Sequence, residues 1–316
     1  MDLVHFRMVM PPALTRSAVS LLASHDRVLN LVVVRAARPS DGDAIDCDVP
    51  KGVANGILGE LRRLGVDRAG SIAVDDVGLM FSEQAERIEA GQPSVLVHAP
   101  LWASVDAHIR AEGTYLASFY LFLVIAGIIG SVGIMTNSQI LIVAAMVVGP
   151  EYHAITSIAL GLSRRNRRRV REGLRALAAG FALAIVVTLL FSLLARAAGL
   201  QSRAFTLGLR PVSHLIDTPD VFSVVVAALA GVVGIVSLTE ARSSALLGVF
   251  ISVTTIPAAS DVAVSLAFGD WREARGSLIQ LVLNVVVLVL VGVLALRLQR
   301  SLWNRAAGRA ATRPRP

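Results

Sequence analysis

The stretch YLASFYLFLVIAGIIGSVGIM at residues 115–135 contains no charged side chain and decides the class of the fold. Crossing the hydrocarbon core of a bilayer takes about 20 helical residues, and this stretch supplies that length. Similar apolar stretches follow it along the chain: Gln139–Leu162, Leu174–Ala198, Phe222–Leu238, Ala245–Phe268 and Ser277–Leu298. Of the 316 residues 54% are hydrophobic, which is too many for a soluble protein of this size. The sequence therefore predicts an integral membrane protein with six spans.

A repeat within the apolar part predicts how these spans are arranged. The string AGIIGSVG at 126–133 returns as AGVVGIVS at 230–237, and in each case a proline, Pro150 or Pro257, interrupts the span that follows. Three spans per half make the second half enter the membrane from the opposite side, an architecture common among secondary transporters. We expect an all-α bundle of two inverted three-helix repeats with broken second helices, at residues 114–198 and 221–298.

Residues 1–80 alternate apolar and charged side chains as soluble domains do. The expected elements are strand Leu3–Met10, helix Ala13–Ser24, a buried strand Arg27–Ala37, strand Ala44–Val49, helix Lys51–Leu64 and strand Gly70–Val77. This β-α-β-β-α-β order is the ferredoxin-like pattern and predicts an α+β domain. Because a fold alone gives no function, the domain either binds a small regulator or serves only assembly.

Four acidic residues lie on the expected turn and strand near residue 45, namely Asp41, Asp43, Asp46 and Asp48. They lack the glycine and the closing glutamate of an EF-hand loop, so we expect a solvated sheet edge rather than a metal site. Cys47 is the single cysteine, which excludes a disulfide within one chain and a cluster of cysteine ligands. No metal and no cofactor is expected.

A connector at residues 81–113 links the soluble domain to the transmembrane domain at 114–298. Within it, Leu101–Gly113 has the pattern of an amphipathic helix, with Trp102 either at the bilayer interface or packed against the soluble domain. Residues 299–316 form a basic tail.

The net charge of +7 comes mainly from arginines that gather at 164–175 and 297–315. Each patch adjoins an apolar segment, so we expect it to bind anionic lipid and not nucleic acid. With both termini in the cytoplasm, about fifteen arginines lie inside and five outside, as the positive-inside rule requires. Residues 1–12 lack the pattern of a signal peptide. We expect a multi-pass protein of the cytoplasmic (inner) membrane.

The helix breaks at Gly149-Pro150 and Pro257 mark the expected site, because irregular backbone inside a membrane is tolerated where it is buried or lines a wet cavity. Glu151 follows the first break, and a carboxyl group at that depth suggests a binding role. The alternative is that it only complements the dipole of its own helix. His153 either relays protons or is a packing residue.

Asp261 lies one turn after Pro257 and, with the two prolines taken as equivalent, is the counterpart of Ala154. Hydroxyl ligands for a small ion are available at Thr254, Thr255 and Ser260, although such side chains often bond their own backbone. Gln280 and Asn284 share a helix face and either line the path or bridge helices.

Asn137 lies in the first extracellular turn, and Glu240 and Arg242 lie in the corresponding cytoplasmic turn, where they form a gate pair or only a surface pair. The sequence contains no HExxH, Walker or dinucleotide-binding motif. An enzyme is therefore not expected.

The run ILIVAAMVVGPEYHAITSIALGL at 140–162 resembles the bacterial family known as domain of unknown function 389. LLGVFISVTTIPAASDVAVSLAFGDW at 246–271 and Asn284 extend the resemblance, and VLNLVVVRAA at 28–37 with DCDVPKGVANGIL at 46–58 is similar to the soluble part of actinobacterial members. Many relatives have Phe-Gly where this chain has Tyr152-His153, and two prolines at the second break. The resemblance implies the fold and topology, and the family carries no established activity.

These features together predict a homo-oligomeric transport protein that moves an ion or small solute past the crossing of the two broken helices. Glu151 would bind a cation or proton, although the helix N-termini at the same place also suit an anion. The alternatives are a channel gated by a ligand of the N-terminal domain and a non-conducting membrane scaffold or sensor.

Overall fold

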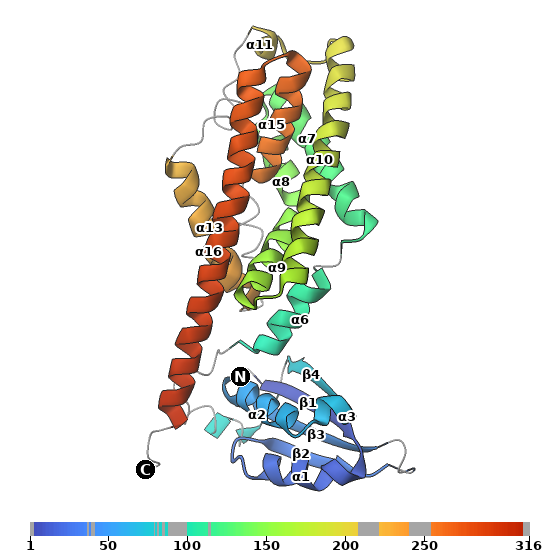
Figure 1. Ribbon diagram of the computed structural model, residues 1–316, viewed down its shortest axis with the longest axis vertical. Coiled ribbons are helices and arrows are strands. Elements are labelled where there is room, and N and C mark those ends of the chain that lie inside the picture. The colour runs from blue at the N-terminus through green and yellow to red at the C-terminus, as the bar shows by residue number, and fades with distance from the viewer. Residues whose placement is uncertain are drawn as a thin grey trace. The chain divides into compact units, whose positions relative to one another are not determined.

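The computed structural model describes residues 3–36, 38, 42–78, 80, 82–83, 86–87, 100–112, 115–207, 221–239 and 254–311. The chain forms two compact units (Figure 1). One contains residues 1–105 and 299–316, and the other contains residues 106–298. Each unit is described separately.

The N-terminal unit is built on a four-stranded antiparallel sheet. Its strands are β1 (Leu3–Met10), β2 (Leu29–Val34), β3 (Asp43–Pro50) and β4 (Ser71–Val77), and their order in the sheet is β2-β3-β1-β4. Helix α1 (Pro12–Ala23) connects β1 to β2, and α2 (Lys51–Arg63) with the short α3 (Val66–Ala69) connects β3 to β4. The predicted order of strands and helices is observed, and α3 is an addition to it.

The positions of β2 and β3 in the sheet reverse two expectations. β2, predicted as a buried strand, is an edge strand on which Val32 and Val34 are more than half exposed. β3 lies inside the sheet, and its acids Asp43 and Asp48 are buried instead of forming a solvated edge. Both are satisfied by side chains, because Thr15 donates to Asp43 over 2.8 Å and Asn30 donates to Asp48 over 2.6 Å.

The predicted connector helix is α6 (Trp102–Glu112), and its first residue is attached to the N-terminal unit. Asn55 of α2 accepts a hydrogen bond from the amide of Trp102 and donates one to the carbonyl of Pro100. Leu101 belongs to the same hydrophobic core as β1. Packing against the soluble domain is therefore what the structure shows for this end of the helix.

The second unit consists of helices. They are α7 (Ala117–Thr136), α8 (Gln139–Val148), α9 (Glu151–Ser163), α10 (Arg167–Ala197), the short α11 (Arg203–Thr206), α13 (Val221–Thr239), α15 (Thr255–Phe268) and α16 (Trp271–Ala311). Four of them, α7, α10, α13 and α16, are long and apolar enough to cross a membrane, and α8 with α9 makes a fifth if the bent pair is one span. The chain is a multi-pass membrane protein.

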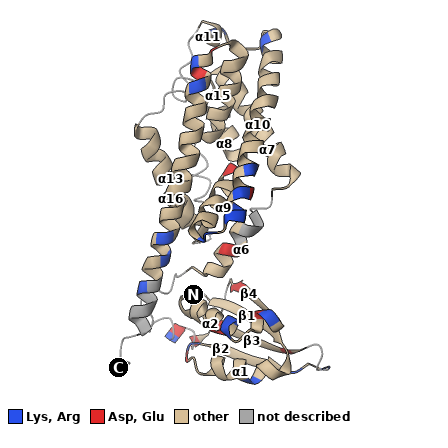
Figure 2. Cartoon of the chain, in the orientation of Figure 1, with Lys and Arg blue, Asp and Glu red and all other residues tan. Residues whose placement is uncertain are grey.

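The predicted sixth span, Ala245–Phe268, is described only from residue 254 onward. Its described part, α15, has 14 residues and is too short to cross a bilayer alone. Six spans therefore stay a prediction. The basic segment at 164–175 is mostly helical, and Asn166 caps α10 by accepting a bond from the amide of Arg169. Figure 2 shows the basic residues gathered where α9 ends and α10 begins. The predicted tail at 299–316 is likewise helical through Ala311.

A constant offset relates three pairs of these helices. Helices α7 and α13 begin at residues 117 and 221, α9 and α15 at 151 and 255, and α10 and α16 at 167 and 271, so each pair differs by 104. The glycine strings at 126 and 230 have the same offset. The members of the last pair, α10 and α16, run in opposite directions (Figure 1).

This offset gives a register different from the one that the prolines give. With 104 residues between equivalent positions, Pro150 corresponds to Thr254 and Asp261 corresponds to Ser157, not to Ala154. Pro150 immediately precedes α9, whereas Pro257 is the third residue of α15. The two prolines are therefore near each other in the repeat without being equivalent.

Candidate functional site

The predicted break at Gly149-Pro150 separates α8 from α9, which meet at a bend of 50°. Proline has no amide hydrogen, so the carbonyl of Met146 loses the donor that a continuous helix would supply. Gly149 adopts an extended conformation there (ψ 128°) and ends α8. Pro257 lies in the first turn of α15, where an amide hydrogen is not needed. Residues 251–253, on which a break before Pro257 depends, lie outside the described part.

Glu151 is the first residue of α9 and is buried, with 5% of its surface exposed. Its Oε1 accepts a hydrogen bond of 2.7 Å from the hydroxyl of Thr255, while Oε2 has no hydrogen-bond partner within the described residues. Gly149 makes room for the carboxyl group, because a Cβ at that position would collide with Oε2. The same Cβ would lie 2.7 Å from Cγ1 of Ile256. The helix break therefore encloses one carboxyl oxygen completely.

Thr255 is the first residue of α15 and Glu151 is the first residue of α9, so the bond joins the starts of two helices that lie 104 residues apart in the sequence. Across a two-fold relation, equivalent residues touch only near the axis. The bond between Thr255 and Glu151 is thus where such an axis would pass.

Thr254 connects this point to α16. Its hydroxyl oxygen accepts a hydrogen bond of 2.7 Å from Asn284, whose Oδ1 in turn accepts a longer bond of 3.4 Å from Gln280. Both amide side chains are 2% exposed. The predicted helix-bridging role of Asn284 is observed, and Oε1 of Gln280 is left without a partner within the described residues.

The other predicted polar residues of α15 have separate partners. Asp261 is fully buried and accepts a hydrogen bond of 2.6 Å from the hydroxyl of Ser277 on α16. Ser260 donates to the carbonyl of Gly127 on α7 over 3.1 Å and to the carbonyl of Ile256 in its own helix over 2.9 Å. These two residues are not bonded to Glu151, so the structure places one group at the break and another along the α15–α16 contact.

The remaining candidates lie elsewhere or outside the described residues. His153 is partly buried two residues into α9, and its amide bonds the carbonyl of Pro150 over 3.3 Å. Asn137 adopts a left-handed conformation (φ 53°) at the C-terminal cap of α7. Glu240 and Arg242, the predicted gate pair, are outside the described part of the chain.

The sequence analysis did not identify the side chains that pack against the glycines of the repeated strings. Gly130 on α7 leaves room for Ser260 on α15, and Gly234 on α13 leaves room for the ring of Tyr152 on α9. Helix α7 therefore packs on α15, and α13 packs on α9. The equal spacing of the two glycine strings was the available signal. Ser277 was missed because nothing in its local sequence marks a donor to Asp261.

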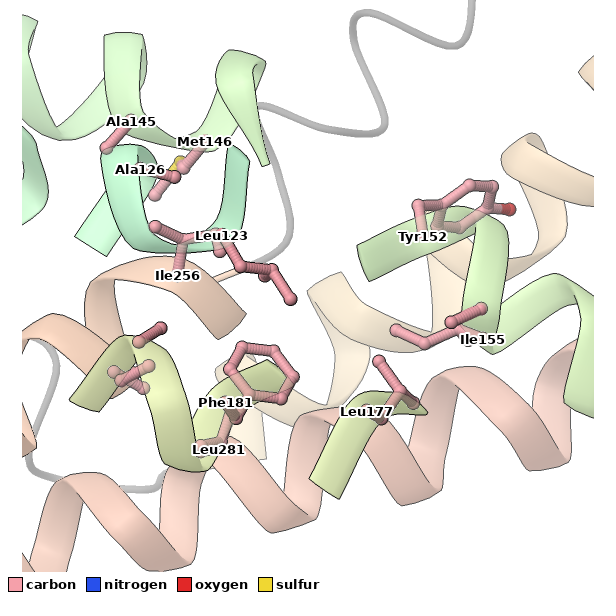
Figure 3. Packing of buried hydrophobic residues seen from close by; sticks show 14 of the residues in the cluster. Leu123, Ala126, Ala145, Met146, Tyr152, Ile155, Leu177, Phe181, Ile256 and Leu281 are labelled. Carbon is pink, nitrogen blue, oxygen red and sulfur yellow. The ribbon is translucent and has the colours of Figure 1, made fainter. Parts of the chain in front are cut away.

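Apolar side chains surround this polar centre. Figure 3 shows Ile256 beside Leu123, with Ala126, Ala145 and Met146 close to them. These residues are buried and come from α7, α8 and the start of α15. In such surroundings an electrostatic interaction is stronger than in water, and an unpaired polar atom is correspondingly costly.

No curated protein and no solved structure matches the chain. Residues 146–290, which include Glu151, Thr255, Asp261 and Asn284, match a family model. The model is that of the Domain of unknown function (DUF389), and the match supports membership of the chain in this family.

Proposed function

We propose that this protein is a membrane transport protein of the secondary-transporter type, which moves an ion or small solute through a site where α9 and α15 begin. The observation that carries the proposal is the buried hydrogen bond between Glu151 and Thr255. An acid within a membrane-spanning segment is costly, and such residues commonly mark ion and substrate pathways. If this position served packing alone, an apolar side chain would fill it at a lower cost in free energy.

The offset of 104 residues supports an inverted repeat as the framework of this site. Equivalent helix starts, reciprocal glycine contacts and the opposite directions of α10 and α16 are what two inverted halves of three spans would give. In that arrangement the two-fold axis lies in the membrane plane, so a bond on the axis lies near the midplane. The α9–α15 contact is then the natural place for alternating access.

The proposal extends to the rest of the chain. The strand order β2-β3-β1-β4 with antiparallel pairing supports a ferredoxin-like domain. The arginines at the start of α10 support a cytoplasmic end that binds anionic lipid, with both termini in the cytoplasm. We propose a homo-oligomer in the cytoplasmic (inner) membrane that has no enzymatic role and needs no cofactor.

Flux in proteoliposomes tests the proposed function. Wild type, Glu151→Gln and Glu172→Gln are reconstituted and given a panel of ions and small solutes under several imposed gradients. Glu172 is an exposed acid on α10, so its variant controls for the loss of one carboxyl group. We expect flux in wild type and Glu172→Gln and none in correctly assembled Glu151→Gln. Equal flux in all three proteins would refute a path through the α9–α15 contact.

The second candidate function is a non-conducting scaffold or sensor. The observation that favours it is the pairing of buried polar groups, since Asp261 with Ser277 and Asn284 with Thr254 are contacts that also serve helix association. This candidate predicts no flux in any variant over the whole panel. A ligand-gated channel is separated from a transporter by uphill accumulation, which a channel does not perform.

A further inference from the structure

The surroundings of Glu151 define what kind of ligand its carboxyl group can hold. Oε1 is bonded by the hydroxyl of Thr255, and Oε2 lies so close to Gly149 that a Cβ there would collide with it. Oε2 is buried and has no hydrogen-bond partner within the described residues. One oxygen is therefore free to take a ligand, and the side chain of Ile256 packs on the same glycine.

An ionised carboxylate in this position would have no basic partner among the described residues. The ion pairs of the described residues join other acids to their basic partners, and none involves Glu151. Burying an unpaired charge costs several kcal/mol, so the charge must be neutralised by a bound cation or by a proton.

The geometry favours the proton over a metal cation. A hard cation is held by about six oxygen ligands, but within the described residues Oε2 is buried without any polar partner, and it lies against Gly149, on which Ile256 also packs. The described residues also contain no group of three or more His, Cys, Asp or Glu side chains that would hold a metal ion. A proton needs only the carboxyl oxygen itself. An anion is disfavoured because it would meet the carboxyl group with no basic side chain paired to that group.

Other titratable groups lie on the helices of the membrane unit. Helix α8 has none, α7 has Tyr120, α9 has Tyr152 and His153, α15 has Asp261, α10 has Arg167, Arg168, Arg169, Arg171, Glu172 and Arg175 near its start and Arg196 near its end, and the part of α16 in this unit has Arg272, Glu273, Arg275 and Arg297. If one of these groups titrates, its pH response must be distinguished from that of Glu151 by a variant of that group.

We infer that Glu151 is a proton-binding residue and that the ligand of this site is a proton. Resting on the proposed function, this makes transport proton-coupled. Oε2 gains a proton from water on the side of the membrane where protons are more abundant. The carboxyl group is then neutral, and the site closes around it. The same O–H bond breaks when the site opens to water on the other side, and the proton leaves with that water.

Infrared difference spectroscopy of the full chain in lipid nanodiscs tests the inference without requiring a known solute. A protonated carboxyl group has a C=O stretching band distinct from the bands of a carboxylate. Spectra are recorded between about pH 5 and pH 9, which brackets the range in which a buried carboxyl group titrates. The proteins are wild type, Glu151→Gln, Asp261→Asn, Glu172→Gln and Thr255→Val.

We expect a protonated-carboxyl band that Glu151→Gln removes and that persists in Asp261→Asn and Glu172→Gln. In Thr255→Val the same band should move to higher frequency, because the carbonyl oxygen loses a hydrogen bond. The inference is overturned if Glu151→Gln leaves the spectrum unchanged at every pH. It is also overturned if sodium or potassium ions, added at constant pH, replace the band by that of a carboxylate.

The two proposals fail separately. A Glu151 band without flux for any solute would retain proton binding and reject transport, leaving a site suited to a pH sensor. Flux that depends on Glu151 without such a band would retain transport and reject the proton as the ligand.

Discussion

The bond from Thr255 to Glu151 allows the charge of its acceptor to be measured through protein stability. Thr255 is fully buried and donates over 2.7 Å, and valine has nearly the same shape without the hydroxyl group. A hydrogen bond to a neutral acceptor contributes about 0.5–1.5 kcal/mol to folding, whereas one to an ionised group contributes about 1.5–3 kcal/mol. The free energy of unfolding that Thr255→Val removes therefore depends on whether Glu151 carries a proton.

If Glu151 is neutral, its carbonyl oxygen and that of glutamine are similar acceptors. Thr255→Val should then lower the free energy of unfolding by about 1 kcal/mol both in wild type and in Glu151→Gln. The two costs should agree within about 0.5 kcal/mol, which is the usual agreement for uncoupled changes. The assay is reversible unfolding in mixed micelles at a pH of about 6, followed by circular dichroism. Thr206→Val, at an exposed threonine of α11, is the control and should change stability by less than about 0.5 kcal/mol.

A cost in wild type that exceeds the cost in Glu151→Gln by more than about 1 kcal/mol would show an ionised acceptor and refute the reasoning on proton binding. A cost of zero in both backgrounds would show that the hydroxyl group makes no stabilising bond, and would remove the observation on which the proposed site rests.

Three further predictions concern single positions. Gly149→Ala should destabilise the membrane unit by about 1–3 kcal/mol in the same micelle assay, because the new Cβ would meet Oε2 of Glu151 and the side chain of Ile256. The control is Gly59→Ala, whose new Cβ would have no atom within 4 Å, and it should leave stability unchanged or raise it slightly. Ser277→Ala should lower stability by about 1–3 kcal/mol through the lost donor to Asp261, and an unchanged midpoint would contradict that bond. Burial, with smaller contributions from neighbouring acids, raises the pKa of Cys47 from 9.0 to about 12. N-ethylmaleimide should therefore label Cys47 only after unfolding. Since the unfolded thiol ionises first, stability should fall as the pH rises from about 9 towards 12, and the fall should be smaller in Cys47→Ala.

The two wrong expectations for the N-terminal domain concern the burial of β2 and β3, which depends on the strands that each one pairs with. The run LNLVVV at 29–34 is apolar and predicts a strand, but the strand lies at the edge because β3, not β2, pairs with β1. The acids of β3 look solvated in the sequence, while Thr15 and Asn30, which satisfy them, are distant along the chain. The local sequence pattern predicts that a strand forms, whereas its pairing with strands distant in the sequence determines which residues surround it.

The membrane part was more predictable, because a break in an apolar helix has a local cause. Pro150 and Glu151 were identified from the sequence, and Thr255 was among the residues expected near them. Which residue bonds Glu151 was not predictable, because the register was taken from the prolines. Proline at the third helical position and proline before the first are both compatible with a helix start, so the prolines fix the register only to within a few residues.

In the inverted repeat that we propose, Glu151 and Thr255 occupy equivalent positions, and this bears on stoichiometry. Had both equivalent positions carried glutamate, two carboxyl groups would meet on the axis, and the mutual repulsion of their charges would make them titrate as a coupled pair. With threonine at one position, the pair has a single ionisable group, and the hydroxyl group donates to it whether or not the carboxyl group is protonated. The site therefore keeps its hydrogen bond when the proton leaves, and the negative charge that appears is shared by the two carboxyl oxygens. We expect one proton per chain at this site, and the divergence of the two equivalent residues is the physical reason.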